Sequence, residues 1–313
     1  MRKNSASVAQ SVPAAQPASF APPVGGFREI DGRRVFVYRM GGGGPAVVFL
    51  PGAGAVGLDY FAVQRGVSQF STAVVYDRCG SGYSDRVPLP RTAAAVATEL
   101  HEVLGAEGLA EPVVLVAHSL GGAHAHRFAQ LYPDKVAGLV WLDGFHRDWQ
   151  GFLPAAVTQT VGEQAAPSSE QIRQLRPALR EMYAELVADY PQHMRQPLID
   201  AHGSEEWFRV GVAERGSLVA LAEELRAGPG LPDVPLIAIS VEGTGIGPQA
   251  RMPEETLLAI REGMRNMAAA VADAVPSGEH RVVSGVGHDQ LCFLRPEVVV
   301  QAVRDVLERA GCA

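Results

Sequence analysis

Residues 112–122 read PVVLVAHSLGG, an apolar, β-branched run that passes directly into a serine and two glycines. The run is typical of a buried strand, and residues 123–132 have a helical period that stops at Pro133. A serine between a strand and a helix, with a small residue two positions to either side, fits a sharp turn that exposes its hydroxyl. Ala117 and Gly121 are those small residues. The pattern predicts Ser119 as a nucleophile, the alternative being a turn that merely begins the helix.

The bulk composition narrows the class of protein. The chain has 313 residues, of which 47% are hydrophobic and 19% charged, and this suits an α/β domain with an insertion. A net charge of -7 argues against nucleic acid or an anionic membrane as a partner. No apolar stretch approaches the ~20 residues of a membrane span. Three scattered cysteines predict neither a disulfide framework nor a zinc site, and they are most simply reduced thiols in a cytoplasmic protein.

The first 26 residues differ in composition from the rest. Residues 1–26 are rich in Ala, Pro, Ser and Val, and no continuous apolar segment follows Arg2 and Lys3. A secretory signal is therefore not expected. We expect this segment to be disordered and the fold to begin near Phe27.

Strand-like and helix-like segments alternate through the first half of the chain. Asp31-Gly32 between two strand-like runs is a strong hairpin signal. Further apolar strands are expected at residues 46–50, 72–76, 113–116 and 136–142. Helical sequence such as 92–104 lies between several of them. This alternation predicts a mostly parallel sheet flanked by helices, with ligands gathered at the carboxyl ends of its strands.

The alternation of strand-like and helix-like segments stops after the sixth predicted strand and begins again near the C-terminus. Residues 144–232 have mainly helical patterns broken by prolines, and we expect a helical cap inserted over the strand ends. The rhythm resumes with strands at 234–240 and 281–283 and with helices at about 253–274 and 296–310. The predicted α/β core therefore comprises residues 27–143 and 233–313.

A serine hydroxyl is a weak nucleophile until a base removes its proton, so Ser119 requires a histidine. The side chain of His118 should point away from that of Ser119, and His124 and His126 on the following helix suit structural or surface roles better. His288 follows the last predicted strand at the end of a glycine-rich loop. A general base belongs on such a loop, so His288 is the predicted base.

With Ser119 and His288 in this order, the chain resembles the α/β-hydrolase superfamily. The resemblance extends from about Phe27 to the C-terminus and is weakest across the presumed cap. It implies that Ser119 is the nucleophile and His288 the base, and it implies no metal and no organic cofactor.

Two loops carry the resemblance further. Residues 48–54, VFLPGAG, resemble the family's loop after the third strand, which implies an oxyanion hole made by the backbone N–H groups of Ala53 and Leu120. The usual His-Gly of that loop is Pro51-Gly52 here, which alters the support of the loop. Residues 77–84, DRCGSGYS, resemble the family's Asp-x-Arg-Gly-x-Gly-x-Ser turn with the arginine one residue early. We expect that turn to be structural and do not expect a catalytic Cys79.

The resemblance also implies a third catalytic residue, a carboxylate that orients His288. Two carboxylates of this chain are candidates for that role. In the family's commonest arrangement this carboxylate follows the seventh strand, where Thr244 stands here. Some members place it after the sixth strand, which indicates Asp143, and Glu242 is the alternative. We favour Asp143 because it ends a strand cleanly, although it would also serve as a helix N-cap. Asp289 is adjacent to His288 and is poorly placed to fold back on it.

The expected reaction is hydrolysis of a carboxylic ester of a small or medium, largely uncharged substrate through an acyl-enzyme on Ser119. A serine nucleophile disfavours the dehalogenases and epoxide hydrolases of the superfamily, which use an aspartate. Thioester, lactone, amide or carbon–carbon hydrolysis and a non-catalytic ligand-binding protein are the alternatives. Phe145, Trp149 and Trp207 of the predicted cap are candidates for substrate contact, or else they hold the cap to the core.

Overall fold

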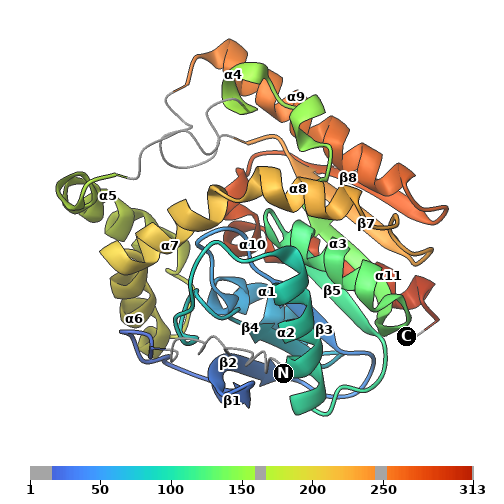
Figure 1. Ribbon diagram of the computed structural model, residues 1–313, viewed down its shortest axis with the longest axis horizontal. Helices are drawn as coiled ribbons and strands as arrows, with labels where there is room; N and C mark the ends of the chain where they lie inside the picture. The colour runs from blue at the N-terminus through green and yellow to red at the C-terminus, as the bar shows by residue number, and fades with distance from the viewer. Residues whose placement is uncertain (1–15, 159–166, 244–251, 312–313) are drawn as a thin grey trace, which may run out of the picture.

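The computed structural model describes residues 16–158, 167–243 and 252–311 (Figure 1). These residues form an eight-stranded sheet in the order β1-β2-β4-β3-β5-β6-β7-β8. The strands are β1 (Gly26–Ile30), β2 (Arg33–Met40), β3 (Val47–Leu50), β4 (Ala73–Tyr76), β5 (Val113–His118), β6 (Val136–Leu142), β7 (Leu236–Val241) and β8 (Gly278–Val283). Strand β2 runs antiparallel to β1 and β4, and the remaining pairs are parallel. The predicted mostly parallel sheet is confirmed.

The β1–β2 hairpin forms where the Asp-Gly signal predicts it. Asp31 and Gly32 have φ angles of 49° and 71°, and Ile30 pairs with Arg33 across the turn. Two successive positive φ angles define the turn type whose twist matches the flanking strands, and Asp-Gly is among the pairs that adopt it most readily.

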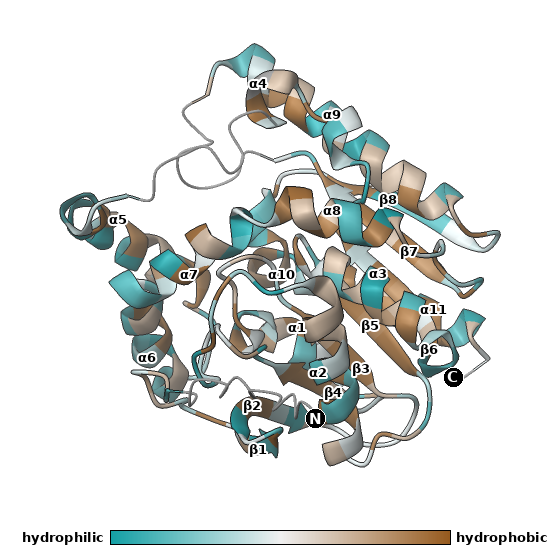
Figure 2. Ribbon diagram, viewed as in Figure 1, coloured by the Kyte–Doolittle hydropathy of each residue, from teal (hydrophilic) through white to brown (hydrophobic). Residues whose placement is uncertain are grey.

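The alternation of side chains along each strand divides the apolar residues between two cores. Val47 and Phe49 of β3 belong to one core, and Val48 and Leu50 to the other. Helices α1 (Phe61–Val67) and α11 (Pro296–Arg309) pack on the first, and α2 (Ala93–Ala106), α3 (Gly121–Leu131) and α9 (Glu254–Asp273) on the second. Because both faces are covered, the central strands are apolar along most of their length, as Figure 2 shows.

The chain between β6 and β7 is helical over much of its described part. It contains α4 (Ala155–Thr158), α5 (Ser169–Leu186), α6 (Gln192–His202), α7 (Glu205–Arg215) and α8 (Leu218–Arg226). Ser168 and Ser204 cap α5 and α7 by accepting the backbone N–H of the residue three positions on. Figure 1 shows α5, α6 and α7 grouped beside the sheet and α8 crossing near α3. We call α4 to α8 the cap.

The described part of the N-terminal segment, residues 16–25, contacts the rest of the fold. Gln16 forms an isolated antiparallel bridge with Arg86, and the ring of Phe20 packs edge-on against Trp207 at 6.0 Å. Val24 packs against the core. Phe20 and Val24 are half-buried in these contacts, and the expected disorder of residues 1–26 stays a prediction. Residues 1–15 lie outside the described part of the chain.

Within the described ranges, no helix is both long enough and apolar enough to cross a membrane. Cys79 and Cys292 are free thiols in the interior, and burial raises the pKa of both well above its ordinary value. Cys312 lies outside the described residues. The cytoplasmic location stays a prediction.

Candidate active site

Ser119 occupies a strained turn between β5 and α3. Its φ is 51°, in the left-handed region of backbone conformation that residues with a Cβ rarely adopt. Three backbone hydrogen bonds hold the turn: the Ser119 N–H donates to Leu142 O at 3.1 Å, and the Ser119 carbonyl accepts from Gly122 and Phe145 at 2.9 and 2.8 Å. Neighbouring strand β6 and the chain after it thus hold the serine in the strained conformation.

Small residues let helix α3 approach the end of strand β3. A Cβ on Gly121 would lie 2.1 Å from the carbonyl oxygen of Leu50, and one on Gly122 would lie 2.7 Å from Phe145 N. Only glycine fits at either position without movement of the backbone. The approach brings the N-terminus of α3 beside the loop that follows β3.

Asp143 and His288 are hydrogen-bonded to one another. Asp143 follows β6 directly with a φ of 46°, and its backbone N–H donates to Ile239 O at 2.7 Å. Its Oδ2 lies 3.0 Å from His288 Nδ1, and its side chain is only 3% exposed. Its Oδ1 accepts the backbone N–H of Val241 at 3.4 Å. Both carboxylate oxygens therefore have partners, and the imidazole is oriented through Nδ1.

The environment of His288 favours its protonated form. Burial alone lowers the pKa of His288, but the hydrogen bond and the charge of Asp143, helped by Asp289, outweigh it and raise the pKa to about 9. Because Nδ1 faces Asp143, Nε2 is the nitrogen left to exchange a proton. Among the described residues, neither this Nε2 nor Ser119 Oγ has a hydrogen-bond partner, so the structure shows no hydrogen bond between the serine and the imidazole.

The alternative acid lies apart from the imidazole. Glu242 accepts the hydroxyl of Ser284 at 3.1 Å and pairs with Arg265 at 3.6 Å, and its side chain is 41% exposed. The structure brings Asp143, not Glu242, to His288. Thr244 lies outside the described residues.

The backbone N–H groups of Ala53 and Leu120, which are the oxyanion donors expected from the sequence, have no hydrogen-bond partner within the described part of the chain. Leu120 stands at the N-terminus of α3, where the first N–H groups have no partner in the helix. The N–H groups on either side of Ala53 are bonded, Gly52 to Tyr60 Oη at 3.3 Å and Gly54 to Glu214 at 2.8 Å. Residues 51–54 are called the donor loop below.

Arg78 and Glu214, which sequence reasoning missed as site residues, brace the donor loop. The Arg78 guanidinium donates to the carbonyls of Pro51 and Gly52 at 2.9 and 2.8 Å and to Glu214 at 2.7 Å. Arg78 belongs to the turn at residues 77–84, but Glu214 lies in cap helix α7. Nothing in the local sequence around Glu214 distinguishes it from a surface carboxylate of an ordinary helix.

A chain of hydrogen bonds links the donor loop to the backbone of His288. Tyr60 Oη accepts the Gly52 N–H and lies 2.8 Å from His118 Nδ1, and His118 Nε2 lies 3.1 Å from the His288 carbonyl. A carbonyl can only accept, so His118 carries its proton on Nε2 and accepts the Tyr60 hydroxyl proton on Nδ1. Burial lowers the pKa of His118 to about 3, so this histidine is neutral.

Two further histidines have structural surroundings. His124 and His126 of α3 are buried, and burial is the main cause that lowers the pKa of each. They are therefore neutral packing residues of the interior.

The three aromatic candidates separate into two places. Phe145 and Trp149 belong to an apolar cluster that includes Leu120, with Ala53 packed against it. Trp207 lies elsewhere: its ring packs on those of Phe20, Tyr83 and His202 in the main core. Its ring joins α7 to the N-terminal segment and the sheet, which is the alternative role considered from the sequence, and a contact of Trp207 with substrate stays a prediction.

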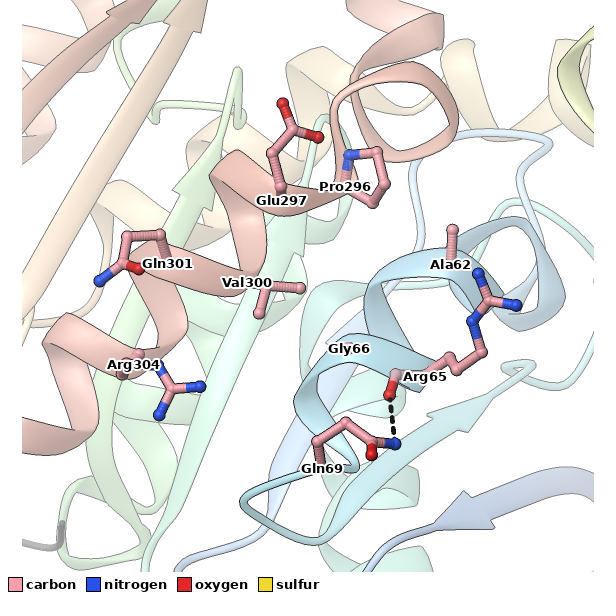
Figure 3. A pocket seen from close by; sticks show the side chains of 9 residues that line it. All are labelled: Ala62, Arg65, Gly66, Gln69, Pro296, Glu297, Val300, Gln301 and Arg304. Atoms are coloured by element: carbon pink, nitrogen blue, oxygen red, sulfur yellow. Dashed lines mark hydrogen bonds between the residues drawn. The ribbon is translucent and has the colours of Figure 1, made fainter. Parts of the chain in front are cut away.

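A surface pocket of about 580 Å³ lies between α1 and α11, and none of its nine lining residues belongs to the candidate site (Figure 3). Across the ranges that the structure describes, no group of three or more His, Cys, Asp and Glu side chains is placed to hold a metal ion.

Comparison with known sequences gives a family and partial relatives. The model of the alpha/beta hydrolase family matches residues 47–302. A putative carbamate hydrolase, RutD, of Cronobacter turicensis is 36% identical over 104 residues, which are 33% of this chain and 39% of RutD. The uncharacterized protein Rv2715 of Mycobacterium tuberculosis is 35% identical over 121 residues, 38% of this chain and 35% of that protein. The matched segments span little more than a third of these relatives.

Comparison with solved structures gives the same fold at low identity. An esterase of Thermogutta terrifontis has a TM-score of 0.55 at 20% identity, covering 91% of this chain and 97% of the esterase. The epoxide hydrolase CorEH has a TM-score of 0.63 at 18% identity, covering 91% and 98%. Est816, an N-acyl homoserine lactone degrading enzyme, has a TM-score of 0.60 at 21% identity, covering 89% and 99%. With the family model matching most of its length, the chain belongs to the alpha/beta hydrolase family.

Proposed function

We propose that this protein is a serine hydrolase that cleaves carboxylic esters of small or medium, largely uncharged substrates through an acyl-enzyme on Ser119. The observation that carries the proposal is the 3.0 Å hydrogen bond from His288 Nδ1 to Asp143, which leaves Nε2 as the base. A second observation supports it: Ser119 has a strained φ of 51° at the end of β5, the strand beside β6. A nucleophile, a base and an orienting carboxylate are the three parts that acyl transfer requires.

Acylation begins when Ser119 Oγ attacks the substrate carbonyl and His288 Nε2 takes the hydroxyl proton. The imidazolium that forms is stabilised by the adjacent Asp143 carboxylate. The N–H groups of Ala53 and Leu120 hold the oxyanion of the tetrahedral intermediate, and loss of one such donor costs about 2.7–4 kcal/mol of transition-state stabilisation in other enzymes. The intermediate collapses, and His288 returns the proton to the departing alcohol.

Deacylation repeats the same steps with water. His288 Nε2 removes a proton from a water molecule, which attacks the acyl carbonyl, and the same two N–H groups hold the second oxyanion. Collapse releases the carboxylic acid and returns the proton to Ser119.

The surroundings of the donors favour an uncharged substrate. Leu120 and Ala53 adjoin the apolar cluster of Phe145 and Trp149, whose described members carry no charged side chain to pair with a charged acyl or alcohol group. The net charge of -7 also opposes strongly anionic substrates.

The same groups would serve a carbamate, thioester, lactone or amide. The match to a putative carbamate hydrolase over 104 residues is a specific reason to include carbamates in any substrate survey. Cleavage of an epoxide is disfavoured, because the residue at the turn is a serine rather than the aspartate such enzymes use.

Labelling with a fluorophosphonate probe tests the proposal. The native chain should be labelled and Ser119→Ala should not, because the probe reacts with an activated serine. p-Nitrophenyl acetate, butyrate and octanoate, assayed beside a thioester, a lactone and a carbamate, then identify the bond. A native chain that takes up no label and hydrolyses none of these would instead indicate a ligand-binding protein of this fold.

A further inference from the structure

We propose that the ion pair between Arg78 and Glu214 positions the backbone N–H of Ala53, so that cap helix α7 takes part in stabilising the oxyanion. This inference rests on the proposed hydrolase function and adds to it. Arg78 and Glu214 do not touch the reacting atoms in this scheme. They are positioning residues that act through the donor loop.

The ion pair binds the donor loop on both sides of Ala53. Arg78 donates Nη1 to the Pro51 carbonyl and Nη2 to the Gly52 carbonyl, at 2.9 and 2.8 Å. Glu214 Oε2 accepts the N–H of Gly54 at 2.8 Å. The two carbonyls before Ala53 and the N–H group after it are thus all hydrogen-bonded to the ion pair. The Ala53 N–H lies between these bonds and is unpaired among the described residues.

The pair itself is buried and well bonded. Arg78 is 3% and Glu214 5% exposed at the side chain, and the guanidinium Nε donates to Glu214 Oε1 at 2.7 Å. Two charges withdrawn from water are costly unless their remaining hydrogen-bonding capacity is satisfied. Here the donor loop makes the remaining hydrogen bonds: two of its carbonyls accept from Arg78, and one of its N–H groups donates to Glu214. Cation, anion and loop therefore form one unit whose geometry is strongly constrained.

Close backbone packing between loop and cap supports the assignment independently. A Cβ on Gly54 would lie 2.9 Å from the Cα of Gly211, and one on Gly211 would lie 3.1 Å from the Cα of Gly54. Gly211 lies one turn before Glu214 on α7. Two glycines in contact allow α7 to approach near enough for a carboxylate to reach the loop amide.

Glu214→Gln is the most direct variant, because it keeps the shape of the side chain. An amide has one acceptor oxygen where Gly54 and Arg78 require two, so one of these donors faces an NH₂ group. Glu206→Gln is the matched control: Glu206 lies on the same helix and pairs with Arg86 of the core, away from the donor loop. Arg78→Lys is a second variant, since lysine keeps the charge but cannot bind two carbonyls and a carboxylate in the fork geometry of arginine.

The readouts are kcat and KM for p-nitrophenyl butyrate, the rate of fluorophosphonate labelling, and amide hydrogen exchange at Gly54 measured by NMR. We expect Glu214→Gln and Arg78→Lys to lower kcat and the labelling rate about 10²-fold with little change in KM, because a displaced donor loses transition-state stabilisation. Exchange at Gly54 should accelerate in the same variants. Glu206→Gln should keep all three values within about twofold of the native chain, the size expected away from a site.

Equal effects of Glu214→Gln and Glu206→Gln on labelling and on Gly54 exchange would overturn the inference while leaving the hydrolase function intact. A native chain that takes up no label would instead overturn the proposed function. The exchange experiment still decides the positioning role in that case: selective loss of protection at Gly54 supports it, and unchanged protection contradicts it.

Discussion

Asp143 Oδ2 and His288 Nδ1 lie 3.0 Å apart although 145 positions separate the two residues in the chain. Asp143 directly follows β6, and His288 comes soon after β8. Strand β7 runs between these two strands in the sheet. The contact therefore crosses one strand, and it depends on parallel strands ending at a common edge.

Replacement of the acid should separate the two carboxylates considered from the sequence. Asp143→Asn removes the charge that stabilises the imidazolium and allows the wrong tautomer, so we expect kcat for p-nitrophenyl butyrate to fall by about 10⁴-fold. Glu242→Gln should change kcat by less than about twofold, because Glu242 is half-exposed and bonded to Ser284 and Arg265. Steady-state kinetics of the two variants measure this, and similar losses in both would contradict the assignment.

The pH profile should reflect the raised pKa of His288. The base must be neutral to accept the Ser119 proton, and Asp143 holds the pKa of His288 at about 9. We expect kcat/KM to rise with pH, to reach half its maximal value near pH 9 and to level off only above that pH. Asp143→Asn removes the first cause of the increase and leaves burial, which lowers the pKa, so the midpoint of its residual activity should move to lower pH. A midpoint that stays in place would show that another group titrates.

The same pKa predicts a pH-dependent contribution to folding stability. A histidine whose pKa is raised above its unfolded value of about 6.5 stabilises the fold fully below that pH. The contribution is lost as the pH rises through about 9, the folded value. Denaturant unfolding of the native chain and of His288→Gln should therefore differ more at pH 6 than at pH 9.5. A difference independent of pH would exclude this linkage.

The strained turn at Ser119 predicts that a residue without a Cβ at this position raises the free energy of unfolding, although the protein then lacks its nucleophile. Ser119→Ala keeps a Cβ at a φ of 51°, whereas Ser119→Gly removes it. Both variants lose the nucleophile and should be inactive. The glycine variant should be the more stable by about 1 kcal/mol, since relief of a left-handed conformation exceeds the entropy cost of glycine. Chemical denaturation of the two proteins measures the difference, and a more stable alanine variant would mean that the turn stores little strain.

Close packing at the start of α3 predicts opposite effects for two glycine substitutions. A Cβ at Gly121 would lie 2.1 Å from Leu50 O, whereas one at Gly105 in α2 meets nothing within 4 Å. Gly121→Ala should destabilise the protein by about 1–3 kcal/mol and displace the turn at Ser119. Gly105→Ala should be neutral or stabilising by up to about 1 kcal/mol, because alanine favours a helix. Thermal unfolding of both variants tests this, and equal Tm changes would contradict it.

Features encoded in a few consecutive residues were predictable from the sequence. The Asp31-Gly32 turn and the apolar strands follow from local conformational preference and from the period of the side chains. The turn at Ser119 belongs to the same class, because small residues at Ala117 and Gly121 signal it directly. The order of strands and helices then implied that Ser119, Asp143 and His288 follow strands that end at one edge of the sheet.

Contacts between residues far apart in the chain could not be predicted in this way, because no short stretch of sequence indicates them. Gln16 to Val24 resemble a disordered tail in composition, but Phe20 of this segment packs on Trp207 of the cap. The sequence favoured Asp143 but did not exclude Glu242, because both residues follow strands near His288.

The sequence by itself determined the strand and helix pattern, the nucleophile turn and the candidate base, since each rests on residues within a few positions of one another. Only the tertiary structure decided which carboxylate meets His288, where Trp207 packs, and that Glu214 reaches a loop 160 positions away. Such pairings depend on how helices pack over the sheet. Packing is set by the summed burial of many side chains, which no short stretch of sequence contains.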